Sequence, residues 1–285
     1  MIKKINYFLQ SIFVYFFFLV GRLLGLRLSR CLYAIFFSLI GPFFKSRKIV
    51  EKNLNIFRKK NSKFNQKKII KNMWKNYGMT FIEYIFLDRF RKSSSHMLIK
   101  DQGILSKVFE NKRPVIFISG HFANFELMSM EITKNNIPLA TIYRPLNNFF
   151  LNPFMEYLRK KYICKNQIKK GISGVRESID YIKKNHSIAL MIDQRVSEGE
   201  KINLFDEPAL TTTLPAQLAI KYGIKIIPVF IERDSNSNFI IEFQNKIDPK
   251  DFKDKIELSK KLNEILERMI IKNPNQWIWT HNRWK

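Results

Sequence analysis

The feature that most limits the possible folds is an apolar run that leads directly into a glycine turn with reactive side chains. Residues 114–118, Pro-Val-Ile-Phe-Ile, have the length and β-branched content of a buried strand, and Ser-Gly-His-Phe-Ala-Asn-Phe-Glu follows at once over residues 119–126. This order of strand, turn and helix is typical of α/β proteins, in which functional groups gather at the carboxyl ends of strands. We therefore predict that His121 lies in the turn and Glu126 in the first turns of a helix.

His121 and Glu126 are candidates for a catalytic pair, although their spacing imposes a condition. On an unbroken helix, side chains five residues apart point about 140° away from each other, so the two can meet only if the chain bends at Gly120 and His121. In that geometry the imidazole would take a proton from a hydroxyl, and the carboxylate would fix its tautomer and stabilise the imidazolium. The alternative is an unrelated surface histidine and glutamate, because this spacing alone is weakly specific.

The pattern of apolar residues changes near Lys112 to alternating strands and helices. This alternation predicts an α/β fold with a mixed, largely parallel central sheet flanked by helices. We expect strands at residues 114–119, 138–143, 187–192 and 226–231, a possible further strand at 239–243, and helices near 124–134, 148–162, 173–184, 213–222 and 256–271.

The N-terminus has the composition of a membrane anchor. Residues 5–21 contain no charged side chain, and Lys3, Lys4 and Arg22 flank them. This length is at the lower limit for crossing a bilayer, and the flanking basic side chains are placed where they can reach the head groups. We expect residues 1–44 to form a hydrophobic membrane-anchoring helix that crosses the membrane once or lies in its interface. A buried helical hairpin in a soluble protein is the alternative.

The charge balance predicts anionic partners. Lys and Arg total 50 against 24 Asp and Glu, which gives a net charge of +26, and 26 residues are Phe. Nucleic acid would satisfy the charge alone, whereas an anionic membrane, a phosphorylated lipid or an acidic carrier protein would also suit an apolar chain. We expect a basic helical region over residues 45–110 and an α/β core over 111–285. Cys31 and Cys164 provide neither a disulfide framework nor a metal-ligand cluster.

Polar side chains also follow the next two predicted core strands. Arg144 comes after the strand at 138–143, where it could bind a phosphate or stabilise an oxyanion, and an ordinary surface ion pair is the alternative. Asp193, Gln194 and Arg195 follow the strand at 187–192. If the strands are parallel, Asp193 could organise the same site and Arg195 could hold an anion there.

Two further segments carry candidate site residues. Thr213 precedes Pro215 at the start of a predicted helix, so it could cap the helix or help to bind an anion at its N-terminus. Three tryptophans lie with His281 and Arg283 in the segment 277–284. This segment either packs on the core or forms a wall of a lipid pocket.

Taken in order, these motifs resemble the bacterial lipid A late acyltransferases, the lauroyl and myristoyl acyltransferase family. The resemblance spans most of the chain and is more specific than any single motif. Its parts are Trp-x-Asn-Tyr-Gly (74–78), Ser-Gly-His-Phe-Ala-Asn-Phe-Glu (119–126), Ile-Tyr-Arg-Pro (142–145), Ile-Asp-Gln-Arg (192–195), Ala-Leu-Thr-Thr-Thr-Leu-Pro (209–215) and Trp-x-Trp-x-His-x-Arg-Trp (277–284).

The resemblance implies an O-acyltransferase with a fold like that of the glycerolipid acyltransferases, which use a similar histidine and acidic pair. Such an enzyme moves a fatty acyl chain from acyl carrier protein to a hydroxyl of a lipid A precursor, on the cytoplasmic face of the bacterial inner membrane. It implies no metal or redox cofactor, with the acyl carrier protein thioester as co-substrate. The implied partners are acyl carrier protein, the glycolipid precursor and an anionic membrane, without nucleic acid.

Carried over by position, the resemblance implies that His121 is the general base and Glu126 its orienting partner. Arg144 becomes the oxyanion or phosphate ligand, and we assign Arg195 a similar anion-binding role. The expected substrate contacts are Asn124, Asp193, Gln194 and Thr213. The segment Leu204-Phe205-Asp206-Glu207 departs from the richer Phe and Gly content of many family members, which leaves acyl preference open.

Two other functions are compatible with the same residues. A lysophospholipid or other glycolipid O-acyltransferase would use the same pair of side chains on another acceptor. A non-catalytic basic protein that binds membranes or nucleic acid would explain the net charge, but nucleic-acid binding does not account for the apolar N-terminus or the polar strand ends.

Overall fold

The computed structural model describes residues 2–44 and 47–285, which are built around one large sheet and a separate hairpin. The sheet has seven strands in the order β1-β9-β8-β2-β5-β3-β4, and β6 pairs with β7 in the antiparallel hairpin. Strands β8, β2, β5, β3 and β4 run parallel, β9 is antiparallel to β8, and β1 is parallel to β9. The bounds are β1 (Met97–Lys100), β2 (Ile116–Ser119), β3 (Leu139–Tyr143), β4 (Asn166–Lys169), β5 (Ser187–Met191), β6 (Glu200–Leu204), β7 (Glu207–Thr211), β8 (Ile226–Arg233) and β9 (Phe239–Phe243).

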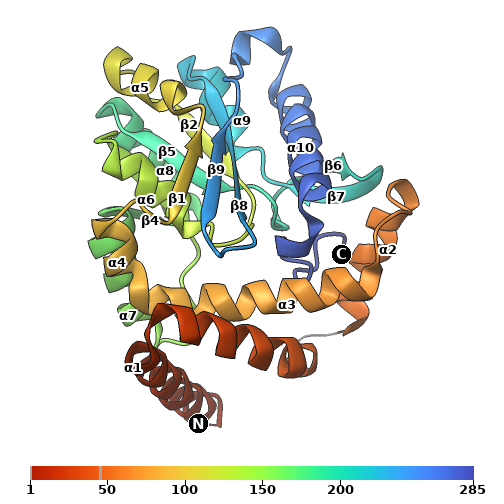
Figure 1. The fold of residues 1–285 in the computed structure, drawn as a ribbon. Helices are drawn as coiled ribbons and strands as arrows, with labels where there is room; N and C mark the ends of the chain where they lie inside the picture. The colour runs from red at the N-terminus through yellow and green to blue at the C-terminus, as the bar shows by residue number, and fades with distance from the viewer. Residues whose placement is uncertain (1, 45–46) are drawn as a thin grey trace.

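Helices cover both faces of the sheet and one of its ends (Figure 1). Helices α6 and α8 lie on one face and α9 and α10 on the other, while α3 and part of α1 run across the end of the sheet. The bounds are α1 (Ile2–Phe44), α2 (Arg47–Lys60), α3 (Gln66–Glu83), α4 (Leu87–Lys92), α5 (Gln102–Asn111), α6 (Glu126–Lys134), α7 (Asn152–Leu158), α8 (Ile172–Lys183), α9 (Leu214–Tyr222) and α10 (Lys255–Lys272).

The predicted fold class is confirmed. The five expected strands correspond to β2, β3, β5, β8 and β9, and β2 is buried along its whole length, as its apolar sequence requires. The strands that the sequence did not predict are β1, β4 and the hairpin β6–β7. Strand β1 pairs with β9, so the main sheet begins within the region that we expected to be helical and upstream of residue 111.

Helix α1 consists of two helical halves joined by a kink at Gly25, whose φ of 74° is the left-handed conformation that glycine adopts without strain. The second half packs closely along α3. A Cβ at Gly78 of α3 would lie only 2.1 Å from the carbonyl oxygen of Tyr33, so only glycine permits this approach.

The first half of α1 leaves most of its apolar side chains uncovered. The helix is long and apolar enough to cross a membrane by length and composition, and only 17% of its most apolar window is buried within the described residues. Exposed apolar side chains along the first half include Leu9, Phe13, Phe16, Leu19 and Leu23. This exposure is what a membrane anchor requires, and it disfavours the buried hairpin.

Candidate active site

A cavity of about 480 Å³ opens beside the carboxyl ends of β2, β3 and β5. Its polar lining includes His121, Glu126, Arg144, Arg159, Gln194 and Thr212. These residues come from segments far apart in the chain, and they meet because neighbouring parallel strands end at the same edge of the sheet. The structure therefore brings His121, Arg144 and Gln194 together at one cavity.

His121 is held by the carboxylate of Asp193. The ring atom Nδ1 of His121 lies 2.7 Å from Oδ1 of Asp193, and the backbone N–H of His121 donates to Oδ2 over 2.7 Å. The indole N–H of Trp277 donates to the same Oδ2 over 2.9 Å. Because β2 and β5 are adjacent, the turn after one strand meets the carboxylate after the other. The bond at Nδ1 leaves Nε2 of His121, which lies 3.5 Å from the side-chain amide nitrogen of Gln194, as the ring nitrogen that can meet a reacting group.

Asp193 is ionised in this environment. Burial alone would raise the pKa of Asp193, but the positive charge of a protonated His121 and the hydrogen bonds from His121 and Trp277 outweigh burial and hold that pKa below its usual range. A buried carboxylate on one ring nitrogen fixes the tautomer and stabilises the ring when the other nitrogen takes a proton. The His121 and Asp193 pair therefore has the parts of a general base.

The structure corrects the predicted pairing of His121 with Glu126. The chain does bend at His121, but α6 begins at Glu126, and the Glu126 carboxylate contacts other side chains beside the cavity. There, Oε1 of Glu126 accepts hydrogen bonds from the Tyr84 hydroxyl over 2.6 Å and from Nε of Arg159 over 2.7 Å. A second guanidinium nitrogen of Arg159 lies 2.6 Å away. The partner of His121 is Asp193, which we had placed in the site wall.

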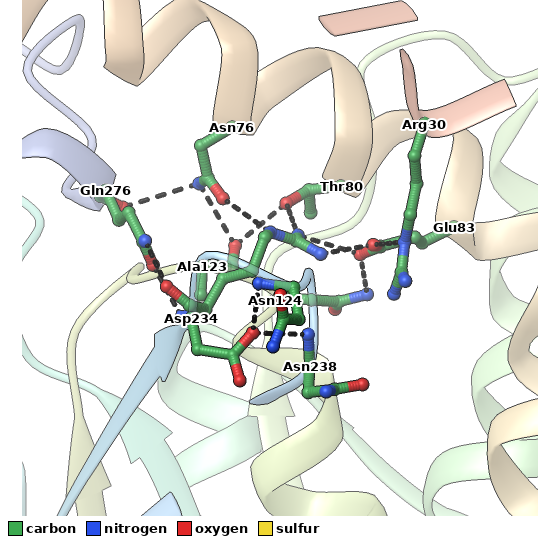
Figure 2. Close-up of polar contacts among 11 residues, drawn as sticks. Arg30, Asn76, Thr80, Glu83, Ala123, Asn124, Asp234, Asn238 and Gln276 are labelled. Atoms are coloured by element: carbon green, nitrogen blue, oxygen red, sulfur yellow. Dashed lines mark hydrogen bonds and ion pairs between the residues drawn. The ribbon is translucent and has the colours of Figure 1, made fainter. Parts of the chain in front are cut away.

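The back of the His121 turn is fixed by α3. Ala123 has a φ of 44°, and its carbonyl oxygen accepts hydrogen bonds from Thr80 Oγ1 over 2.9 Å and Asn76 Nδ2 over 3.4 Å. Its backbone N–H donates to the carbonyl of Gln276 over 3.2 Å. Figure 2 shows Asn76 and Thr80 pointing from one helix toward Ala123. A strained backbone at a functional turn persists only where its surroundings hold it, and α3 supplies that support.

Behind the same turn lies a buried charge cluster, which we define as Glu83, Arg30, Arg233 and Asn124. Glu83 is fully buried and pairs with Arg233 at 2.5 Å and with Arg30 at 2.6 Å. The Asn124 amide donates to Glu83 over 3.0 Å (Figure 2). Burial alone would raise the pKa of Glu83, but Arg233 and Arg30 outweigh burial and hold that pKa below its usual range. The cluster ties α1, α3, β8 and the His121 turn together.

Asn124 and Thr213 do not lie where we expected substrate contacts. Asn124 is fully buried, and its amide points into the charge cluster because the turn at Ala123 directs it toward α3. Thr213 is also buried, and its hydroxyl accepts a hydrogen bond from the Gln217 side chain over 2.9 Å instead of capping α9. The neighbouring Thr212 lines the cavity in its place.

The two candidate anion ligands also differ. Arg144 is exposed at the end of β3 and lines the cavity beside Lys170, so it is available to a bound anion. Arg195 is half-buried outside the lining, and its backbone N–H donates to Nε2 of His281 over 3.0 Å. Burial lowers the pKa of His281, which keeps that ring neutral and able to accept this bond. The geometry thus favours Arg144 over Arg195 as the anion ligand.

The sequence analysis did not identify Arg159, Tyr84 and Lys170 as site residues. Arg159 lies in the π-helix Arg159–Ile163 directly after α7, within a run of three basic residues. Nothing in the spacing distinguishes it from the many other cationic residues of the chain. The Trp-rich tail does have the packing role that we considered, because Trp277, Trp279 and Trp284 are all buried.

Comparisons with known proteins extend these observations. The model of a family described as bacterial lipid A biosynthesis acyltransferase matches residues 2–285. A lipid A biosynthesis palmitoleoyltransferase of Escherichia coli (strain K12) is 24% identical over 254 residues, which cover 86% of this chain and 80% of that protein. A lipid A biosynthesis acyltransferase of Shigella flexneri matches to the same extent.

Among solved structures, the chain is similar to the 1-acyl-sn-glycerophosphate acyltransferase of Thermotoga maritima. The match has a TM-score of 0.43 and 15% sequence identity, and it covers 89% of this chain and 100% of the other.

Proposed function

The chain belongs to the family of bacterial lipid A biosynthesis acyltransferases, and on that premise we propose that it transfers a fatty acyl group from acyl carrier protein to a hydroxyl of a lipid A precursor. The proposal includes a location at the cytoplasmic face of the bacterial inner membrane, where α1 would anchor the enzyme. The observation that supports the chemistry is the 2.7 Å contact between His121 Nδ1 and Asp193, with the same ring lining a cavity that can receive a substrate.

In the proposed reaction, Nε2 of His121 takes the proton from the acceptor hydroxyl while the hydroxyl oxygen attacks the carbonyl carbon of the thioester. Asp193 stabilises the imidazolium that forms. The tetrahedral intermediate then collapses, the carbon–sulfur bond breaks, and the imidazolium returns the proton to the leaving thiolate. A thioester is already activated, so this sequence requires no metal or redox cofactor.

Arg144 is the proposed ligand of the negative charge that enters the cavity. Its guanidinium is exposed at the rim and can hold two oxygens of the oxyanion or of a precursor phosphate. Lys170 lines the same wall, and burial together with the nearby charge of Arg144 lowers its pKa. This side of the cavity therefore attracts anionic glycolipids and acyl donors.

Glu126 takes a different part in this proposal from the one that its spacing suggested. Its carboxylate neutralises Arg159 and accepts from Tyr84, so it shapes the inner wall of the cavity and does not orient the base. The role of orienting partner passes to Asp193.

Product analysis with purified full-length enzyme tests the function. The enzyme in detergent is incubated with acyl carrier protein thioesters and a tetra-acylated or penta-acylated precursor, and mass spectrometry follows the gain of one acyl chain. We expect His121→Ala to lower turnover by about 10²- to 10⁴-fold. His186→Ala is the matched control, because His186 bonds only to the backbone of its own turn through Nδ1 and lies outside the cavity lining.

The outcomes separate the parts of the proposal. A folded His121→Ala enzyme with half of the wild-type activity contradicts the base assignment. Faster acylation of lysophospholipids than of the lipid A precursor would instead favour the lysophospholipid acyltransferase. Transfer from acyl-coenzyme A but not from acyl carrier protein would contradict the proposed donor.

A further inference from the structure

The loop between β3 and α7 carries apolar side chains that the described part of the chain covers only in part. We call residues 146–150 the aromatic loop. The exposed fractions of the side chains are 40% for Leu146, 48% for Phe149 and 37% for Phe150. Large apolar side chains that gather in one loop of a soluble surface usually mark a contact with another apolar body.

This loop is fixed against the first half of α1. Asn148 is buried and its amide donates to the carbonyl of Tyr7 over 2.8 Å, while the Tyr15 hydroxyl donates to the carbonyl of Phe150 over 2.9 Å. Phe149 packs on Tyr7 with ring centroids 6.0 Å apart, and Phe150 packs on Phe8 at 5.4 Å. The aromatic loop therefore lies against the first half of α1, which exposes most of its apolar side chains.

The aromatic loop also forms part of the rim of the cavity. Leu146 and the adjoining Asn147 line the cavity together with Arg144 and Pro145. Phe149 and Phe150 lie outside the lining. The loop thus joins the anchor helix on one side to the entrance of the site on the other.

We propose that the aromatic loop lies in the lipid interface beside the first half of α1, so that the cavity opens directly onto the membrane surface. The proposal rests on the membrane anchoring that is part of the proposed function. The occupant is a lipid surface because the exposed apolar side chains of the loop continue those of α1 without a break in contact. Aromatic rings suit the head-group level, and Lys3, Lys4 and Arg144 can meet anionic head groups.

This placement has a consequence for how the acceptor arrives. A glycolipid embedded in the membrane would pass from the bilayer to His121 without leaving the interface fully. Its acyl chains would stay in the bilayer while its polar part reaches Arg144. The loop would therefore affect the use of membrane-embedded acceptor and leave the chemical step unchanged.

Site-specific labelling tests the location. Phe149→Cys, in a Cys31→Ser background, is labelled with an environment-sensitive nitrobenzoxadiazole dye in the full chain and reconstituted in vesicles of zwitterionic and anionic phospholipid. Cys164 is buried and burial raises the pKa of its thiol to about 11, so it should not compete for label. The matched control is Phe109→Cys, which is 50% exposed on α5, at the end of the molecule far from the start of α1 (Figure 1).

We expect blue-shifted emission at position 149 and quenching by nitroxide-labelled lipids, with neither effect at position 109. Equal lack of quenching at both positions overturns the proposal. If the dye at 149 is unquenched in vesicles but shifts when acyl carrier protein is added, the loop is a protein-binding surface and the lipid assignment is wrong.

A functional test uses Phe149→Ser/Phe150→Ser. We expect KM for acceptor embedded in vesicles to rise by about tenfold, because two aromatic contacts with lipid are lost, while kcat with detergent-dispersed acceptor stays within about twofold. Phe109→Ser is the control and should change neither value. An equal loss with both forms of acceptor shows that the loop supports the cavity itself and overturns the interface assignment. If the wild-type enzyme acylates neither form, the proposed function fails, and the labelling result still decides the position of the loop.

Discussion

Two buried carboxylates flank the His121 turn, and they differ in what neutralises them. Asp193 accepts hydrogen bonds from the His121 ring, the His121 backbone and the Trp277 indole, and the charge opposite it is the one that His121 carries when protonated. Glu126 faces Arg159, which is always charged. The negative charge of Asp193 is therefore available to an imidazolium, whereas that of Glu126 is already offset.

The spacing of two residues in a sequence motif does not determine which side chains they contact in the fold. Glu126 follows His121 at a motif-like distance, yet its carboxylate bonds to Tyr84 and Arg159. Burial alone would lower the pKa of Arg159, but the adjacent Glu126 and Tyr84 outweigh burial and raise it, so Arg159 stays charged beside Glu126. Asp193, more than seventy residues away, makes the contact that the proposed reaction needs.

Substitutions of Asp193 should have the largest effect on kcat. Asp193→Ala should lower kcat by about 10³- to 10⁴-fold, because the ring loses both its tautomer and the charge that stabilises its protonated form. Asp193→Asn should be nearly as inactive, since an amide can hydrogen-bond the ring but carries no charge. Steady-state kinetics with a melting curve for each variant measures this. Near wild-type kcat in a folded Asp193→Asn enzyme would contradict the claim that the charge of Asp193 stabilises the imidazolium.

Substitutions of Glu126 should mainly lower the free energy of unfolding. Glu126→Ala leaves Arg159 buried without its partner, which should cost about 3 to 5 kcal/mol in the free energy of unfolding. Glu126→Gln should be milder, because the amide oxygen still accepts from Tyr84. The double variant Glu126→Leu/Arg159→Met should recover much of the lost stability, as apolar groups of similar size replace the ion pair. Chemical denaturation measures the three variants.

An effect of Glu126 on the base itself would contradict this division. If Glu126→Gln shifts the acid limb of the pH profile of kcat while Asp193→Asn does not, the roles of the two carboxylates are exchanged.

The two arginines of the cavity, Arg144 and Arg159, also differ in whether a carboxylate neutralises them. Arg159 is held by Glu126, whereas Arg144 is exposed at the rim, so Arg144→Lys should lose about 10- to 100-fold in kcat/KM, nearly as much as Arg144→Ala. The reason is that an ammonium cannot hold two oxygens in a fixed plane. Arg176→Lys, at an exposed position on α8, serves as the control. Full activity of Arg144→Lys would reduce Arg144 to a source of positive charge.

The smallest effect concerns pH. The folded pKa of Asp193 lies below its unfolded value of about 3.9, so the stability that Asp193 contributes is present above that value and is lost as pH falls through the folded pKa. The difference in Tm between the wild type and Asp193→Asn should therefore be nearly the same at pH 7 and pH 5 and should shrink below about pH 4. A difference that disappears already by pH 5 would mean that the Asp193 pKa is raised.

The sequence predicted those parts of the fold that depend on local apolar content. Strand β2 is an unbroken apolar run and was found within two residues of its observed start. Strand β4, Asn-Gln-Ile-Lys, lies at the edge of the sheet and carries mostly polar side chains, so periodicity gives it no signal. The hairpin β6–β7 is likewise rich in polar residues.

Part of the membership of the candidate site was predictable from the sequence, but the pairing of its side chains was not. Strand ends mark His121, Arg144, Asp193 and Gln194 as members of one edge, because parallel strands bring their carboxyl ends together. Which carboxylate meets His121 depends on β2 and β5 being neighbours, and strand order is a long-range property. The position of Asn124 depends on the positive φ of Ala123, and an alanine in a sequence does not predict a positive φ.

The buried charge cluster determines when the active site can be completed during synthesis. Its members come from α1, α3, the His121 turn and the end of β8, and the same turn binds Gln276, which follows all of them in the sequence. A ribosome makes the chain from its N-terminal side, at about 5 to 20 residues per second. The anchor helix therefore leaves the ribosome before Gln276 does, and the support of the His121 turn is completed only when Gln276 emerges. The enzyme can reach its membrane before it is able to react.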